Sequence, residues 1–244
     1  MSKLLEISDL YGGYERGVNV LQGISLSVEE KEAVGIVGQN GTGKSTLGKA
    51  IINQLPHRRG SIVFKDQPIE DKSTYELAQM GIALMHQGGV VFPNLSVWQN
   101  IQLAFGTDVE KDYYKRLKSI IPLLQHFEED SENKLKYKMA DKLSGGQRHE
   151  LALAMTLARQ PKLVVLDEPS AGLAPIAVDK MYEVLEKIRT EFGITFLLIE
   201  QNVQKAILFC SRCLYLQQGA VVGEFKGELG LKDIERKMFN KELI

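Results

Sequence analysis

Little cysteine, no long apolar run and no excess of either charge characterise this sequence. Its 244 residues include 30 lysines and arginines against 31 aspartates and glutamates. General nucleic-acid-binding proteins are usually clearly basic, so the balanced charge argues against that class and against a nucleic-acid partner. No stretch approaches the roughly 18 apolar residues that a membrane-spanning helix needs.

The N-terminus and the cysteines indicate the compartment. The segment "MSKLLEISDL" carries a glutamate and an aspartate where a signal peptide needs an apolar core, which predicts a cytoplasmic protein. Cys210 and Cys213 form one C-x-x-C pattern. Because no second ligand pair accompanies it, the pattern is weak evidence for a metal site. We expect both cysteines to be core residues beside the apolar segment 213–217.

Strand-like runs alternate with helical segments along the chain, which predicts a parallel sheet with helices on both faces. Strands are expected over residues 4–10, 19–28, 32–38, 61–65, 81–87, 162–167 and 194–200, with two more around 219 and a turn over 56–60. Helices are expected over 44–54, 96–127, 145–159 and 176–192, from 202 onward and at the C-terminus, with 131–142 as a solvated lysine-rich loop.

The segment "GQNGTGKS" matches the phosphate-loop pattern G-x-x-x-x-G-K-[ST] in full, between an apolar run and a predicted helix. Its backbone amides and the helix N-terminus are suited to hold phosphates. We expect Lys44 to reach the β- and γ-phosphates and Ser45 to bind Mg²⁺. The complete motif argues against a turn without a ligand. The expected nucleotide-binding residues are Gly38, Gln39, Asn40, Gly41, Thr42, Gly43, Lys44, Ser45 and Thr46.

Two adjacent carboxylates, Asp167 and Glu168, end the apolar run "LVVL". In phosphate-loop folds an acid at the end of a neighbouring strand faces the loop. Asp167 is therefore expected to hold Mg²⁺, which would offset the repulsion between the two acids, and Glu168 to orient or deprotonate the attacking water. Two exposed acids at a strand end would not explain the apolar run before them.

The segment "LSGGQ" begins the predicted helix at 145. Ser144 and Gln147 fit a capping box, which accounts for a helix start. Gly145 and Gly146 weaken a helix, and they make sense where a phosphate approaches the backbone closely. Because the chain already has a phosphate loop, this nucleotide is expected to belong to a second chain in a two-fold symmetric dimer.

The phosphate loop, "LSGGQ" and "LVVLDEP", in this order and spacing, resemble the ATP-binding cassette (ABC) ATPases over nearly the whole chain. The resemblance implies an α/β fold, with a P-loop NTPase (RecA-like) parallel-sheet core, an N-terminal antiparallel β subdomain and an inserted α-helical subdomain. Residues 1–244 would be one ABC ATPase domain, with its core in 1–87 and 160–244 and its helical subdomain in about 88–159. An insertion also follows from the spacing of Lys44 and Asp167, since a plain βαβ unit needs only about 30 residues.

The same resemblance assigns further site residues. Tyr14 matches the aromatic residue that stacks on adenine, and Gln87 matches the glutamine that touches Mg²⁺ and links the subdomains. Gln201 stands where many relatives have a histidine, and we expect it to contact the γ-phosphate. The implied catalytic set is Glu168, Lys44, Gln87 and Gln201, the implied metal set is Ser45, Gln87 and Asp167, and the implied partner-nucleotide set is Ser144, Gly145, Gly146 and Gln147.

The resemblance also implies partners. The segment 88–100, "GGVVFPNLSVWQN", would form the groove for a coupling helix of a separate integral membrane permease, and 170–175, "SAGLAP", would cross the dimer interface. In much of the family the latter loop carries an aspartate where this chain has Ala174. Phe92 and Leu95 are expected to be at least partly exposed, although packing inside the helical subdomain is an equal alternative.

The predicted protein is therefore an ATPase that uses ATP and Mg²⁺, peripheral on the cytoplasmic face of the inner membrane. It would pair with a second ABC ATPase subunit, identical or different, and an importer adds a periplasmic or lipid-anchored substrate-binding protein. "AGLAP", the short insert and "EQN" resemble branched-chain amino acid importers, and the lipopolysaccharide-export ATPases are the nearest alternative. Lys31, where a glycine is usual, and the unspecific C-terminal tail weaken the substrate assignment.

Three other classes fit less well. A signalling GTPase needs N-K-x-D, whereas this chain has "NKLK" and "NKEL". A DNA-repair or chromosome ATPase of the same superfamily needs a long coiled coil, and no sustained heptads occur. A soluble translation-factor ATPase normally carries two cassettes in one chain, and this chain has one.

Overall fold

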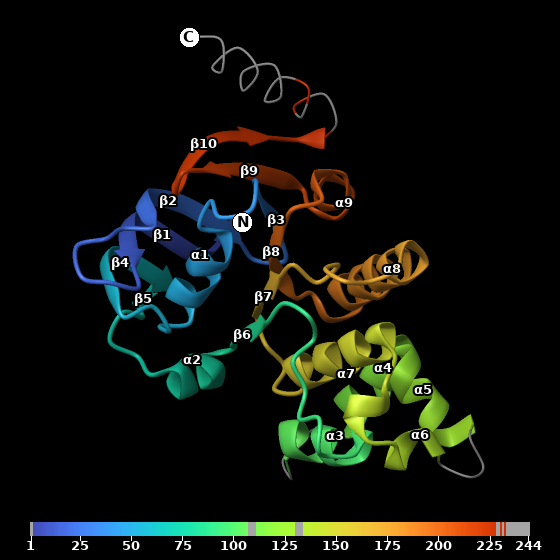
Figure 1. Cartoon of the computed structure of the whole chain (residues 1–244). Coiled ribbons are helices and arrows are strands. Elements are labelled where there is room, and N and C mark those ends of the chain that lie inside the picture. Colours follow the sequence, from blue (N-terminus) through green and yellow to red (C-terminus); the bar gives the residue numbers. More distant parts are fainter. Residues whose placement is uncertain (1, 107–110, 130–133, 228–229, 231, 233–244) are drawn as a thin grey trace. The chain divides into compact units, whose positions relative to one another are not determined.

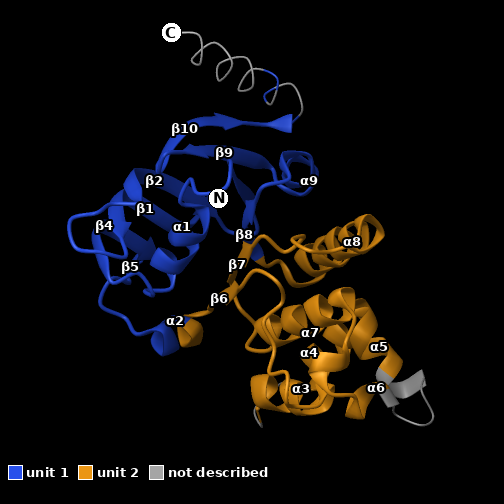
Figure 2. Cartoon of the chain, in the orientation of Figure 1, with its two compact units in different colours: residues 1–77, 195–244 blue, residues 78–194 orange. Residues whose placement is uncertain are grey.

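The computed structural model describes residues 2–106, 111–129, 134–227, 230 and 232. The chain forms two compact units (Figure 2), of which unit 1 comprises residues 1–77 and 195–244 and unit 2 comprises residues 78–194. These units differ from the predicted division into a core and a helical subdomain over about 88–159, which stays a prediction.

Unit 1 contains an antiparallel sheet with the strand order β2-β1-β4-β5 (Figure 1). Buried and more exposed residues largely alternate along β2, as expected of a sheet with one covered face. The strands are β1 (Lys3–Gly13), β2 (Leu21–Glu29), β4 (His57–Phe64) and β5 (Gln67–Pro68).

The second sheet of unit 1 has the order β10-β9-β3-β8. Strand β3 pairs in parallel with β8 and β9, and β10 is antiparallel to β9. Every residue of β3 and β8 is buried, which explains why β3 and the middle of β8 are apolar. These strands are β3 (Ala33–Val37), β8 (Thr195–Glu200), β9 (Arg212–Gln217) and β10 (Ala220–Phe225), and the accompanying helices are α1 (Lys44–Ile51) and α9 (Val203–Phe209).

Unit 2 holds the parallel pair β6 (Ile82–Met85) and β7 (Leu163–Asp167), together with most of the helices. Helix α2 (Thr74–Met80) spans the boundary between the units. The helices of unit 2 are α3 (Val97–Phe105), α4 (Lys111–Ile120), α5 (Pro122–Glu129), α6 (Lys134–Tyr137), α7 (Gly145–Leu157) and α8 (Pro175–Phe192), with a 3-10 turn over Ala140–Lys142.

The predicted α/β class, with parallel strands, a separate antiparallel sheet and helices, is confirmed. The turn predicted over 56–60 is wrong, because His57 to Gly60 belong to β4 and His57 pairs with Gly13 of the long strand β1. Gly60, which suggested a turn, has φ 108° at a register shift instead, where a Cβ would lie 2.4 Å from the Asp9 carbonyl oxygen.

Two further expectations need correction. The solvated loop predicted over 131–142 is partly wrong, because 134–137 form α6 and the backbone of Ala140 bonds to Leu95. Helix α2 was not predicted, and the expected C-terminal helix lies outside the described residues. Cys210 and Cys213 are buried core residues, as predicted, with Cys210 just before β9 and Cys213 within it.

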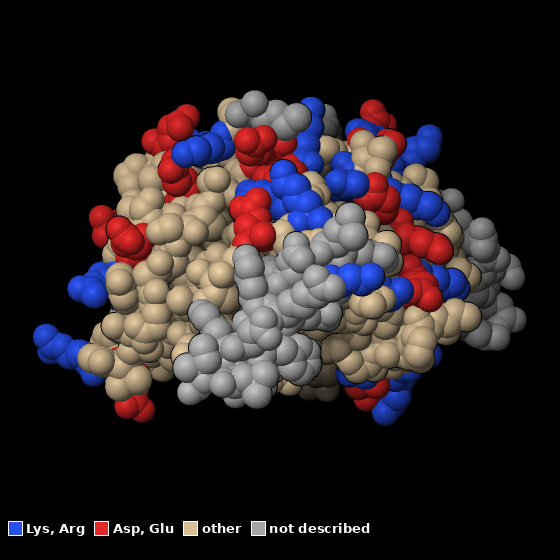
Figure 3. All heavy atoms as spheres, turned by 90° about the horizontal axis from the view of Figure 1, so that it is seen from above, with Lys and Arg blue, Asp and Glu red and all other residues tan. Residues whose placement is uncertain are grey.

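Charged residues of both signs are interspersed over the face shown in Figure 3. This distribution agrees with the formal net charge of −1. Within the described parts of the chain, no helix is both long enough and apolar enough to span a bilayer.

Candidate functional site

The predicted phosphate loop, residues 38–43, connects β3 to α1 in unit 1. Gly43 is the N-cap of α1 with φ 100°, and no side chain among the described residues caps this helix. The first amides of α1 are therefore not taken by a capping side chain and suit an anion. Gly38 is required by packing, since a Cβ there would lie 2.3 Å from the Leu216 carbonyl oxygen on β9.

Lys44 lies inside this loop and is only 4% exposed. Its ammonium group donates to the carbonyl oxygens of Gly38 and Gln39, each at 3.0 Å. The Thr42 hydroxyl donates to the same Gln39 carbonyl at 2.9 Å. The loop is thus folded around a cation, which is the charge that a phosphate group requires.

Tyr14 lies exposed near the middle of α1. Its hydroxyl is 3.4 Å from Thr46 Oγ1, and Lys49 Nζ lies 5.1 Å from the ring centroid and donates to the hydroxyl at 3.3 Å. Lys49 was not predicted from the sequence. Its spacing of three residues from Thr46 on one helix face is the pattern that could have identified it.

Gln201 follows β8 at the edge of the sheet from which the phosphate loop emerges. Val37 and Glu200 are partners in the parallel β3–β8 pair, so the two strands end level with each other. The buried Glu200 carboxylate accepts hydrogen bonds from the backbone N–H groups of Gln201 and Asn202 at 2.9 and 3.1 Å. The exposed Gln201 side chain is therefore carried by a fixed backbone beside the loop.

The role of Gln201 in hydrolysis can be tested through the pH dependence of the ATPase rate. If its amide helps place the attacking water, Gln201→Ala should lose much of the ATPase rate while ATP binding is largely kept. Gln201→His should stay active and gain a pH dependence between about 6 and 7.5, because imidazole titrates there and an amide does not. Steady-state rates across this pH range check both variants. If Gln201→Ala hydrolyses ATP at the wild-type rate, Gln201 takes no part in the reaction and is only a polar residue before Asn202 at the start of a helix.

In unit 2, the predicted residues Gln87 and Glu168 are in direct contact. Gln87 Nε2 donates to Glu168 Oε2 at 2.9 Å. The contact follows from the parallel β6–β7 pair, in which Met85 lies opposite Leu166, because both side chains come just after the strand ends. Glu168 has φ 47°, an uncommon conformation for a non-glycine residue, and this sharp bend follows the buried Asp167.

The donor atoms of this site suit a hard cation. Because the Gln87 NH₂ group donates a hydrogen bond to Glu168, the amide oxygen of Gln87 is the atom that can bind a metal ion. The other two predicted ligands, Asp167 and Ser45, also offer oxygen atoms, and oxygen ligands are those that Mg²⁺ prefers. The residues present therefore fit the predicted metal.

The segment 144–147 begins α7 as predicted. Ser144 is the N-cap, and both hydrogen bonds of the capping box with Gln147 are present at 3.2 Å. The two glycines between them are not required by packing within the unit. A Cβ on Gly145 would lie 3.8 Å from Leu173 Cδ2, and one on Gly146 would lie 3.8 Å from Ala177 Cβ, both ordinary contacts. Packing within the unit therefore does not explain why both positions are glycine.

The side chain of His149 is hydrogen-bonded to the first turn of α7. It is buried, and its Nδ1 is 2.9 Å from the Gly145 carbonyl oxygen. Burial, opposed by this hydrogen bond and aided by nearby Arg148, lowers the pKa of the imidazole. The neutral ring thus donates from Nδ1, and among the described residues Nε2 has no hydrogen-bond partner.

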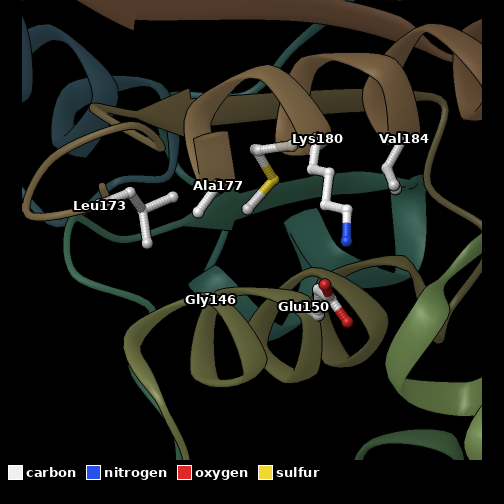
Figure 4. A pocket seen from close by; sticks show the side chains of 7 residues that line it. Gly146, Glu150, Leu173, Ala177, Lys180 and Val184 are labelled. Atoms are coloured by element: carbon white, nitrogen blue, oxygen red, sulfur yellow. The ribbon is translucent and has the colours of Figure 1, made fainter. Parts of the chain in front are cut away.

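A small pocket lies beside Gly146, between α7 and α8 (Figure 4). The Glu150 carboxylate accepts from the Leu123 N–H at the start of α5 at 2.7 Å, and burial raises the pKa of this carboxyl. In the close-up, the ammonium end of Lys180 on α8 points toward Glu150. Glu150 thus ties α7 to α5 and faces α8, which holds the Ser144–Gln147 turn on a rigid support.

The segment 88–100 presents apolar side chains at the surface of unit 2. Val90 is 64% and Phe92 49% exposed, and Leu95 is partly exposed. The prediction for Phe92 and Leu95 is therefore confirmed, and the alternative that they pack in the core is wrong. The fully buried Asn100, which was not predicted, holds the Phe92 backbone by accepting at 2.8 Å and donating at 3.1 Å. A groove lined by Gly88, Gly89, Val90, Ala140, Asp141 and Arg148, among others, lies next to it.

Comparisons with known proteins identify the family. Residues 21–171 match the family model described as ABC transporter. The chain is 32% identical over 218 residues to the high-affinity branched-chain amino acid transport ATP-binding protein BraG of Pseudomonas aeruginosa, with 89% of each chain covered. It is 30% identical over 207 residues to the lipopolysaccharide export system ATP-binding protein LptB of Escherichia coli, covering 85% of this chain and 84% of that protein. A crystal structure of a nucleotide-free ATP-binding cassette from an ABC transporter superposes with a TM-score of 0.79 at 25% identity, covering 96% of both chains.

Proposed function

The chain belongs to the ABC transporter family and is an ATP-binding ATPase, and on that premise we propose that it drives a separate membrane permease by hydrolysing ATP between two subunits. The observation that carries the proposal is the Gln87–Glu168 hydrogen bond at the ends of two parallel strands. A carboxylate held in this way is positioned by another side chain, as a general base or a water-orienting group must be.

Each predicted residue then has a role. The phosphate loop, residues 38–46, binds the phosphates, Lys44 neutralises the β- and γ-phosphates, and Tyr14 stacks on adenine with Lys49 against its ring. Glu168 takes the proton of the attacking water or orients it, and Gln201 helps to place that water. Lys44 is supported by its location inside the loop, and Tyr14 by its exposed ring next to α1.

Ser45, Gln87 and Asp167 would hold Mg²⁺. When bound, this ion neutralises charge on the phosphate oxygens and raises the electrophilicity of phosphorus. The chain's own contribution is to orient the ligands, and the Glu168 contact fixes the Gln87 amide with its oxygen available.

The second subunit would supply Ser144, Gly145, Gly146 and Gln147 to the γ-phosphate. The proposal is supported by the two glycines, which weaken α7 and fill no tight space within their own unit. Residues 170–175 follow Glu168 directly and would cross the same interface. The pair can consist of identical or different subunits.

The exposed apolar side chains of 88–100 would receive a coupling helix of the permease, which would place this subunit peripherally on the cytoplasmic face of the inner membrane. Contiguous apolar surface on a protein usually marks a partner site. Here Val90 lines the groove, Phe92 is an exposed neighbour in the same segment, and the Asn100 hydrogen bonds hold the Phe92 backbone in position.

A substitution at the exposed Phe92 separates docking from folding. Phe92→Ser should cut permease-stimulated ATPase by about tenfold or more, as expected for loss of a buried aromatic anchor, while basal ATPase stays near the wild-type rate. Leu208→Ser, at an exposed apolar position on α9, is the matched control and should change neither rate. Both are measured with and without the permease in detergent. Equal loss of basal and stimulated rates in Phe92→Ser, with a lower melting temperature, would assign Phe92 to the fold instead.

For the transported substrate, we propose branched-chain amino acid import, supported by the similarity to BraG. Lipopolysaccharide export is the second candidate, because the similarity to LptB is nearly as great. The permease that co-purifies with the chain decides between them. Stimulation of its ATPase by leucine, isoleucine or valine with a substrate-binding protein supports import, and stimulation by lipopolysaccharide alone rejects it.

A further inference from the structure

Cys210 and Cys213 are the only cysteines of the chain, and the proposed ATPase mechanism uses neither. Both are thiols outside any disulfide, and both are buried: Cys210 is 9% and Cys213 1% exposed. Cys210 is the C-cap of α9, and Cys213 is the second residue of β9. Helix α9 packs on β3, β8 and β9, which brings its C-terminal end over this sheet.

The two sulfur atoms share the space above Gly35, in the middle of β3. Cys213 is the register partner of Gly35, and a Cβ built on Gly35 would lie 2.6 Å from Cys213 Sγ and 3.4 Å from Cys210 Sγ. Both sulfurs thus lie within 3.4 Å of one point. Glycine is unfavourable inside a strand, so its presence at the centre of a fully buried one is explained by the room that the two thiols need.

We propose that Cys210 and Cys213 form a dithiol site that peroxide-class oxidants convert to a local, reversible disulfide. Cys210, the more exposed thiol, would lose its proton and attack the O–O bond of hydrogen peroxide as thiolate; the sulfenic acid forms, and the departing hydroxide takes up that proton as water. The Cys213 thiol then attacks the sulfenic sulfur, forms the S–S bond and releases a second water. In total, two thiols lose two electrons and two protons, and one peroxide is reduced to two waters.

The backbone between the two cysteines is anchored to the start of β3. The Ser211 N–H donates to the Ala33 carbonyl at 2.9 Å, and Arg212 Nε donates to Glu32 Oε1 at 2.7 Å. Because the linking segment is held, closing the disulfide strains β3 rather than relaxing through the linker. Strand β3 runs directly into Gly38, so oxidation should weaken ATP binding. Of this proposal, only the effect on ATP binding rests on the proposed function.

Trypsin provides a direct test, because Arg212 separates the two cysteines. The folded, full-length protein is treated with hydrogen peroxide, its remaining thiols are blocked with N-ethylmaleimide, and it is digested without reductant. We expect the peptides "AILFCSR" and "CLYLQQGAVVGEFK" to be linked, at a mass two hydrogens below their sum. The link should disappear with dithiothreitol and be absent from Cys210→Ser, and the protein should run as a monomer on a non-reducing gel.

Recovery of both cysteines as maleimide adducts, a sulfinic acid without a link, or a link only between chains would overturn the proposal. Equilibrium ATP binding by the oxidised and reduced protein tests the consequence, with peroxide-treated Cys210→Ser as the control for methionine oxidation. Equal affinity of the linked and reduced forms would refute the coupling to the phosphate loop. Failure of the reduced protein to bind ATP would refute the proposed function and leave the peptide result unaffected.

Discussion

Glu168→Gln is expected to slow ATP hydrolysis by roughly 10²–10⁴-fold, the usual contribution of a general base, while ATP affinity stays near the wild-type value. The substitution removes the basic oxygen and keeps the shape of the side chain. Its amide oxygen can still accept the hydrogen bond that Gln87 Nε2 donates to Glu168 Oε2 at 2.9 Å. Single-turnover hydrolysis together with equilibrium ATP binding separates the two effects.

Gln87→Ala is the companion variant, because it leaves Glu168 ionisable and removes its hydrogen-bonded partner. It should reduce the rate less than Glu168→Gln does. A Glu168→Gln protein that hydrolyses ATP at the wild-type rate would remove Glu168 from the chemistry. Loss of ATP binding in that variant would show that the carboxylate supports the nucleotide site rather than the reaction.

The second large effect is expected for Gly146→Ala. A methyl group at this position has room within its own unit, with Ala177 Cβ at 3.8 Å, and alanine is favoured over glycine inside a helix. The melting temperature of the isolated chain should therefore stay the same or rise. The methyl group would nevertheless add bulk in the first turn of α7, next to the backbone that we assign to the partner's γ-phosphate. Overpacking of a close contact costs about 1–3 kcal/mol, so hydrolysis should fall by roughly 5- to 150-fold.

Gly38→Ala is the contrasting control. A Cβ there would meet the Leu216 carbonyl oxygen at 2.3 Å, so this variant should lower the melting temperature as well as the ATPase rate. Differential scanning fluorimetry and steady-state ATPase assays on both variants check this contrast. If Gly146→Ala retained the full rate, or lost stability to the same extent as Gly38→Ala, the assignment of Gly146 to a partner's nucleotide would be wrong.

Much of this site could be predicted because it depends on backbone conformation or on residues that lie close together in the sequence. The phosphate loop depends on glycines at fixed positions next to a buried strand, and the capping box of Ser144 and Gln147 depends on a separation of three residues. The all-apolar runs of β3, β7 and β8 identified the parallel strands, since strands buried on both faces need no polar alternation.

What could not be predicted depends on contacts between distant segments. Arg59 appeared to be part of a turn, but its guanidinium lies 4.2 Å from the Tyr11 ring centroid across the β1–β4 pair. Asn100 holds the backbone of Phe92, and Glu150 accepts a hydrogen bond from the start of α5. Neither contact could be predicted from the sequence pattern. The room that Gly35 leaves for two sulfurs likewise became visible only in the register of β3 and β9.

The central claim is that two chains enclose ATP between the phosphate loop of one and Ser144–Gln147 of the other. Light scattering of Glu168→Gln after size exclusion in ATP and Mg²⁺ tests it most directly, because hydrolysis can no longer dissolve the complex. The account predicts a species of twice the 27.3 kDa chain mass with ATP, a monomer with ADP, and a monomer with ATP when Gly146→Ala is added. A Glu168→Gln protein that binds ATP and stays monomeric, or that dimerises equally well with Gly146→Ala, would contradict it.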